Sequence, residues 1–161
     1  MTTLSRALLA LLLTAGLAGC VKPEAQAPVT TPAAKHQHHP PHGGTPVVLG
    51  AELYHLELVL DAASGRLSAY VLDGEMEEFI RIAAPSLEIS VTAGGQPRTL
   101  VLSAVASPAT GETVGNTSLF EVQADWLKTM REFDGVLTRI EVRGTAFTAV
   151  AFNFPKGNDR D

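Results

Sequence analysis

The chain has 161 residues, of which 45% are hydrophobic and 18% are charged. This length favours one domain, and this composition is typical of a chain that buries a core. The formal net charge is −5, and no basic cluster is visible, which argues against nucleic acid as a partner. Cys20 is the one cysteine, so an internal disulfide is excluded.

Residues 1–20 have the layout of a secretory signal. Arg6 gives a positive start, residues 7–13 form an apolar run, and small residues follow it. The apolar run is too short to span a membrane as a helix. The tetrapeptide LAGC, which ends at Cys20, resembles the lipobox of bacterial lipoproteins. The resemblance implies cleavage after residue 19, a diacylglyceryl thioether on Cys20, and a fatty acyl chain such as palmitate on the new amino terminus.

Several acyl chains on one residue give stable membrane anchoring. The alternative is an ordinary cleaved signal followed by a free thiol. Val21 follows the cysteine, where lipoproteins of the inner membrane often carry Asp. By resemblance, the chain is expected on the periplasmic face of the outer membrane.

Three further segments are expected after the signal peptide of residues 1–19. Residues 20–45 are rich in Pro, Ala, Thr and Gln and lack periodic apolar positions, which predicts a flexible linker behind the lipidated cysteine. Residues 46–155 are expected to form the folded domain. Residues 156–161 are expected to be a disordered tail.

From residue 46 the apolar residues follow the period of two that is typical of β-strands. Strands are expected at 54–60, 67–72, 87–91, 100–105, 118–122, 136–142 and 146–154, with a short one at 79–82. Asp125 is expected to cap one short helix, with Trp126, Leu127, Met130 and Phe133 on one side. Seven or eight such strands indicate an all-β antiparallel sandwich, and a barrel is the alternative.

The linker holds four of the five histidines of the chain: His36, His38, His39 and His42. Neutral imidazole is a good ligand for Cu²⁺ and Zn²⁺, so the cluster predicts capture of a transition metal ion. Metal binding requires deprotonated rings and should weaken as the pH falls toward about 5. The alternative is a hydrophilic linker with incidental histidines.

Two further metal-ligand candidates lie in the strand expected at 54–60. His55 and Glu57 project from the same face of an ideal strand. If Gly43 and Gly44 fold the linker back over that face, His42 approaches both of them, and the three side chains can meet at one ion. The alternative is that His55 and Glu57 lie on the solvent face of the sheet, and that the glycines form only a turn before the domain.

The residues His42-Gly43-Gly44 and the later HLEL of residues 55–58 resemble the opening of small periplasmic β domains. Some of those domains are attached to adaptor subunits of heavy-metal efflux pumps. The resemblance implies an envelope partner, such as a metal efflux system, although the long hairpin of an adaptor is absent. The segments 123–127 and 151–155 are similar to uncharacterised bacterial lipoproteins, which bring no established activity.

No motif typical of an enzyme is present, because the chain has no G-x-S-x-G, H-E-x-x-H or phosphate-binding glycine loop. We therefore expect a non-enzymatic, lipid-anchored periplasmic protein that binds or delivers Cu²⁺ or Zn²⁺. The alternative is a structural or protein-interaction lipoprotein of the envelope, which uses a sheet edge as a docking site.

Overall fold

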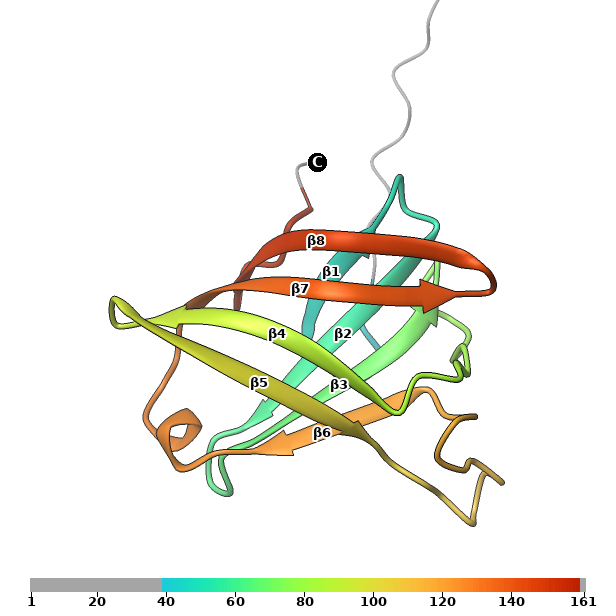
Figure 1. The fold of residues 1–161 in the computed structure, drawn as a ribbon, viewed down its shortest axis with the longest axis horizontal. Helices are drawn as coiled ribbons and strands as arrows, with labels where there is room; N and C mark the ends of the chain where they lie inside the picture. Colours follow the sequence, from blue (N-terminus) through green and yellow to red (C-terminus); the bar gives the residue numbers. More distant parts are fainter. Residues whose placement is uncertain (1–38, 160–161) are drawn as a thin grey trace, which may run out of the picture. The chain divides into compact units, whose positions relative to one another are not determined.

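The structure is a computed structural model and describes residues 39–159. The expected signal peptide, Cys20, His36 and His38 lie outside the described residues. Eight strands and one 3₁₀ turn make up the described part of the chain (Figure 1). They are β1 (Thr45–Leu49), β2 (Tyr54–Asp61), β3 (Arg66–Asp73), β4 (Ser86–Ala93), β5 (Gln96–Ala104), β6 (Leu119–Gln123), η1 (Asp125–Lys128), β7 (Phe133–Val142) and β8 (Thr145–Phe154).

All eight strands belong to one sheet, in the order β1-β2-β3-β6-β5-β4-β7-β8. Every neighbouring pair is antiparallel, which confirms the predicted all-β antiparallel fold. The sheet curls so that β4, β5, β7 and β8 lie across β1, β2 and β3, as in two packed layers (Figure 1). The layers are continuous through a short β5–β6 pairing, so the arrangement is close to a closed barrel.

One apolar core lies inside the curled sheet. In β4, Leu87, Ile89, Val91 and Ala93 are buried and alternate with exposed residues, as the period of two predicts. The other strands add the remaining core side chains, among them Val47, Leu56, Leu58, Leu67, Ala69, Val71, Leu100, Leu102, Phe120, Leu137 and Phe152. Burial of this shared core holds the eight strands together.

The predicted helix after β6 is wrong in its length and in its cap. Only Asp125–Lys128 forms a single 3₁₀ turn, and its capping residue Ala124 makes no side-chain hydrogen bond to it. Asp125 instead forms an ion pair with Lys128, at 2.7 Å. Phe133 belongs to β7, because its ring stacks on that of Phe154 in the neighbouring strand β8, with centroids 5.0 Å apart.

The ordered domain extends beyond the expected limits of residues 46–155. β1, a strand that the sequence pattern did not single out, begins at Thr45, whose hydroxyl donates to the carbonyl of Pro155 at 3.1 Å. After β8, the Asn158 amide accepts from the N–H of Val48 at 2.7 Å and donates to its carbonyl at 3.2 Å. Part of the expected tail therefore pairs with the edge of β1.

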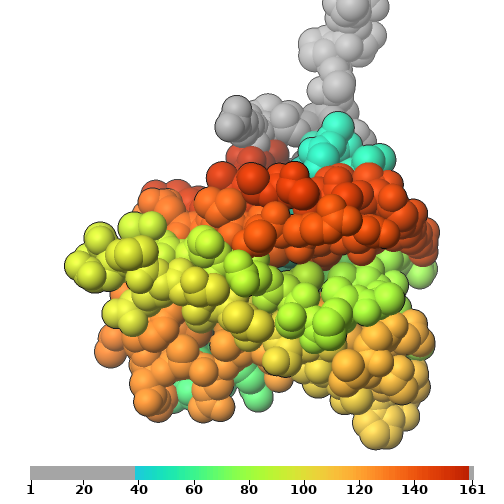
Figure 2. Space-filling model, in the orientation of Figure 1, coloured from blue at the N-terminus to red at the C-terminus, as the bar shows by residue number. Residues whose placement is uncertain are grey.

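Strands β4, β5, β7 and β8 form a broad face of the domain, which Figure 2 shows as the continuous yellow-green to red surface. Along β4 this outer face carries the exposed side chains Ser86, Glu88, Ser90 and Thr92. In residues 39–159, no helix is long and apolar enough to cross a membrane.

Candidate functional site

Strand β2 is buried on both of its faces. Leu56 and Leu58 point into the core, and His55 and Glu57 on the opposite face are both 0% exposed. The alternative expectation that His55 and Glu57 face solvent is therefore wrong. The segment before β1 folds back over Glu57, as the hydrogen bonds between His42 and Glu57 show.

The buried carboxylate of Glu57 binds the segment that leads into the domain. Its Oε1 atom accepts hydrogen bonds from the backbone N–H groups of His42, at 2.8 Å, and Gly44, at 2.9 Å. Its Oε2 atom lies 2.8 Å from Nδ1 of the His42 ring. A carboxylate can only accept, so Nδ1 of His42 is the donor in this contact. Hydrogen bonds to both oxygens compensate the burial of the charge. We call these three contacts the Glu57 clamp.

The residues around the two glycines explain why the chain can enter the clamp. The N–H of Gly43 donates to the carbonyl of Pro40 at 3.0 Å and closes a turn. Gly43 has φ 66°, a conformation that favours glycine. Gly44 passes so close to β2 that a Cβ atom would lie 2.6 Å from the carbonyl oxygen of Leu58 and 2.8 Å from Cγ of Glu57. In the HGG pattern, His42 therefore donates to the carboxylate of Glu57, Gly43 allows the bend, and Gly44 allows the close approach to β2.

An aromatic cluster holds the other side of the His42 ring. Tyr70 lies opposite Glu57 in the β2–β3 pairing, and its ring stacks on His42 with centroids 4.0 Å apart and an angle of 16°. Phe79 lies 5.8 Å from His42 and 6.0 Å from Tyr70. Burial, followed by the charges of Glu121 and Glu57, raises the pKa of Tyr70 above its ordinary value. The neutral phenol ring therefore persists as a stacking surface for the imidazole through the physiological pH range.

The His42 side chain is 37% exposed, although one edge of its ring is held by Glu57. Within residues 39–159, Nε2 of His42 has no hydrogen-bond partner. His39 is exposed three residues earlier in the chain. The site therefore offers one imidazole that is fixed in place and still reaches solvent.

His55 does not join His42 and Glu57 in one cluster of ligands. Its Nδ1 atom lies 3.2 Å from the carbonyl oxygen of Asp73, and its ring is fully buried. No group of three or more His, Cys, Asp or Glu suited to hold a metal ion occurs among the residues that the structure describes. His36 and His38, which belong to the expected ligand set, lie outside them.

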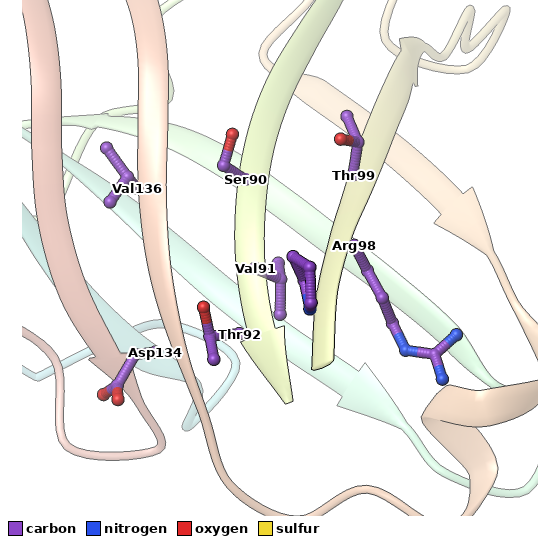
Figure 3. A pocket seen from close by; sticks show the side chains of 8 residues that line it. Ser90, Val91, Thr92, Arg98, Thr99, Asp134 and Val136 are labelled. Atoms are coloured by element: carbon purple, nitrogen blue, oxygen red, sulfur yellow. The ribbon is translucent and has the colours of Figure 1, made fainter. Parts of the chain in front are cut away.

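Away from the Glu57 clamp, a concave surface lies on the outer face of β4, β5 and β7. It is a shallow depression of about 470 Å³, lined by Ser90, Val91, Thr92, Pro97, Arg98, Thr99, Asp134 and Val136 (Figure 3). The Arg98 side chain extends toward the 3₁₀ turn (Figure 3). Its guanidinium carbon lies 5.0 Å from the centre of the Trp126 ring. Asp134 accepts a hydrogen bond from Asn153 at 2.9 Å. The two charged side chains of this depression are thus already paired with neighbours.

Comparisons with protein-family models, curated proteins and solved structures find no match to this chain. The features that point to a function are therefore the Glu57 clamp and the histidines that precede it. Sequence reasoning placed His42 near Glu57 but gave no sign of Tyr70, because its role depends on cross-strand pairing.

Proposed function

We propose that this chain is a lipid-anchored periplasmic protein that binds or delivers Cu²⁺ or Zn²⁺ through His36, His38, His39 and His42. One observation carries the proposal: the exposed His42 ring is held by the fully buried carboxylate of Glu57, at 2.8 Å. Histidine ligands of metal ions characteristically donate their second ring nitrogen to a carboxylate or carbonyl group. The clamp gives His42 this arrangement beside a run of further imidazoles.

The location in the envelope is supported by the sequence that ends at Cys20. A lipidated Cys20 would hold the domain at the membrane, most simply on the periplasmic face of the outer membrane. The linker between Cys20 and His42 would let the histidines reach a partner. The resemblance of HGG and HLEL to β domains of heavy-metal efflux adaptors supports a metal efflux system as that partner.

A second candidate is a structural or protein-interaction lipoprotein without a metal role. The observation that favours it is that both oxygens of Glu57 already accept N–H groups, so the clamp is complete without an ion. In this case the clamp would serve only to fix the linker to the domain. The two candidates differ in whether the linker histidines bind a metal ion tightly.

Calorimetric titration of Cu²⁺ and Zn²⁺ into a lipid-free mature chain that carries Cys20→Ser tests the proposal. We expect submicromolar binding of one ion per chain, which is lost when His36, His38 and His39 are replaced by Ala. The matched control replaces Lys35 and Gln37, two non-histidine residues of the same segment, and should bind as the unsubstituted chain does. Weak binding of several ions that scales only with the number of histidines would contradict a metal function.

The metal titration should compare the unsubstituted chain with substituted chains, and not with a chain that begins at Thr45. Shortening the chain to Thr45 removes His42 and the N–H of Gly44 from the buried carboxylate of Glu57. A buried charge without its partners destabilises the fold, so loss of binding in that chain would have two causes.

A further inference from the structure

A hollow at one end of the curled sheet gathers positive charge and unused backbone donors. It lies where the turn between β7 and β8 meets the segment before β4, at the right-hand end of β7 in Figure 1. Its volume is about 420 Å³, and its lining is Arg81, Ile82, Ala83, Ala84, Glu141, Arg143 and Gly144. We infer that this hollow is a binding site for a phosphate group, carried by a small molecule or by a phospholipid headgroup. The site shares no residue with the Glu57 clamp and does not depend on the proposed metal binding.

Arg81 is held in place while part of its guanidinium remains available. Its Nη2 atom donates to the carbonyl of Thr110 at 2.6 Å, and its Nε atom lies 3.8 Å from Oε1 of Glu112. Glu112 is itself fixed by the hydroxyl and the backbone N–H of Ser118. A guanidinium has five N–H donors, and within residues 39–159 the Nη1 group of Arg81 has no hydrogen-bond partner. Because the group is already oriented, it loses little conformational entropy when it binds an anion.

Arg143 supplies a second guanidinium, and its place in the chain is unusual for an arginine. It occupies the two-residue turn between β7 and β8 with φ 48°, and Gly144 follows with φ 83°. Such turns favour Asn, Asp or Gly at the first position, because other residues are strained at positive φ. The turn itself therefore gives no reason for an arginine. No ion pair or hydrogen bond engages the Arg143 side chain within the part of the chain that the structure describes.

Two backbone N–H groups complete the set of donors. Ala83 and Ala84 lie between the bridge of Ile82 with Thr117 and the start of β4. Among residues 39–159, the N–H groups of both alanines have no hydrogen-bond partner. Ile82 is only 5% exposed, so the segment is fixed to the core. Successive main-chain N–H groups are well suited to phosphate, because they donate without the cost of ordering a side chain.

Glu141 is the one carboxylate of the lining, and its charge is compensated. Its Oε2 atom accepts a hydrogen bond from Nη2 of Arg139 at 2.8 Å. Glu112 pairs with Arg81, which leaves the charge of Arg143 uncompensated within residues 39–159. The whole chain carries a net charge of −5, so a general attraction of anions is not expected. Binding must therefore rest on this local charge.

The arrangement of the donors suits a phosphate better than a carboxylate. A carboxylate has two oxygens in one plane, and a single guanidinium can bind both. A phosphate group presents three acceptor oxygens at tetrahedral corners and takes donors from several directions. In the hollow the donors come from two segments, residues 81–84 and the β7–β8 turn. The volume of the hollow also leaves room for a glycerol or similar group attached to the phosphate.

Arg143→Asn tests the inference, because asparagine suits φ 48° and the turn should fold at least as well. The probe is glycerol 3-phosphate, titrated into residues 20–161 with Cys20→Ser and followed in the ¹H–¹⁵N NMR spectrum. We expect saturable, submillimolar binding that shifts the amide signals of Ala83 and Ala84. Arg143→Asn should weaken the binding at least about 10-fold, which is the effect of losing one charge-assisted hydrogen bond.

The matched control is Arg131→Ala, which removes an exposed arginine just before the other end of β7. Its affinity should equal that of the unsubstituted chain. Glu141→Gln should raise the affinity about 2–5-fold, because it removes the carboxylate of the lining. Unchanged affinity in Arg143→Asn, or a titration that leaves the amide signals of Ala83 and Ala84 in place, would overturn the inference. So would acetate that binds as tightly as the phosphate.

Vesicles distinguish the two sources of the phosphate group. Cosedimentation of the same chain with phosphatidylglycerol vesicles, lost in Arg143→Asn, would assign a phospholipid headgroup. Phosphatidylcholine vesicles, in which choline offsets the phosphate charge, should not bind. Binding of free glycerol 3-phosphate without cosedimentation would assign a soluble ligand. Failure of both probes would overturn the inference and leave the proposed metal binding untouched.

Discussion

The Glu57 carboxylate and the His42 ring meet at 2.8 Å, although fifteen positions separate them in the chain. This contact, together with the backbone N–H groups of His42 and Gly44, makes the end of the expected linker part of the folded domain. The His-rich segment is therefore attached to the sheet at a fixed point.

The first prediction concerns the contribution of the clamp to stability. Glu57→Ala leaves the two backbone N–H groups and Nδ1 of His42 without their acceptor. We expect the free energy of unfolding to fall by about 2–4 kcal/mol, because buried polar groups that lose a partner keep their desolvation cost. Chemical denaturation monitored by Trp126 fluorescence measures the change. The exposed Glu78→Ala should remain within about 0.5 kcal/mol of the unsubstituted chain.

The second prediction is that substitution of Gly44 destabilises the domain more than substitution of Gly43 does. Gly44→Ala would place a Cβ atom 2.6 Å from the carbonyl oxygen of Leu58, so the segment must move away from Glu57. We expect a loss of about 1–3 kcal/mol and faster proteolysis before β1. Gly43→Asn is the control, because asparagine tolerates φ 66° and no atom lies within 4 Å of the Cβ position. Equal losses in both variants would contradict the close-approach role of Gly44.

The strands were predictable because their sequence pattern is local. The alternation of Leu87, Ile89 and Val91, and the turn at Gly94 and Gly95 that follows, indicate a hairpin without knowledge of the fold. The curling of the sheet cannot be predicted from a short stretch of sequence, because it depends on the pairing of β6 with β5 and of β7 with β4. Sequence reasoning therefore left sandwich and barrel as alternatives.

The candidate site was predictable only in part, for the same reason. The sequence shows that His55 and Glu57 share a face and that two glycines precede them, but it does not show what covers that face. Burial of Glu57 depends on the return of His42, and the stack with Tyr70 depends on the β2–β3 register. The predicted helix failed because the spacing of Trp126 and Phe133 fits a helix, whereas Phe133 packs as a strand residue against Phe154.

The third prediction concerns the membrane anchor. If Cys20 is lipidated, the full-length chain expressed in a bacterial envelope should sediment with membranes and incorporate labelled palmitate. Cys20→Ala should abolish both, because no other cysteine is present. Label that persists in Cys20→Ala, or a wild-type chain found only in the soluble periplasmic fraction, would exclude the lipoprotein assignment.

The fourth prediction tests the closure of the sheet by the segment after β8. Asn158→Ala removes both the acceptor for the N–H of Val48 and the donor to its carbonyl. We expect a loss of about 1–2 kcal/mol, the value of two ordinary hydrogen bonds at a partly buried edge. Hydrogen exchange should quicken at Val48 and remain unchanged in β4. Asn116→Ala, which changes an exposed asparagine of the loop before β6, serves as the comparison and should have a smaller effect.

The last prediction concerns stability in acid and rests on Glu112. Burial acts to raise the pKa of Glu112, but hydrogen bonds from Ser118 and Thr110, together with the charge of Arg81, outweigh it and hold the pKa below its ordinary value of 4.5. Ser118 donates both its hydroxyl, at 2.7 Å, and its backbone N–H, at 2.8 Å, to one carboxylate oxygen.

A pKa that is lowered on folding means that the unfolded chain binds the proton more readily. The stabilisation by Glu112 is thus complete above its ordinary pKa of 4.5 and is lost as the pH falls through the lower value of the folded state. Denaturation between pH 7 and pH 3 should therefore show a shallower loss of stability in Glu112→Gln than in the unsubstituted chain. Some loss should persist, because Asp61, bound by Ser64, also has a lowered pKa. Parallel curves for the two chains would show that the Ser118 contacts do not stabilise the charged carboxylate.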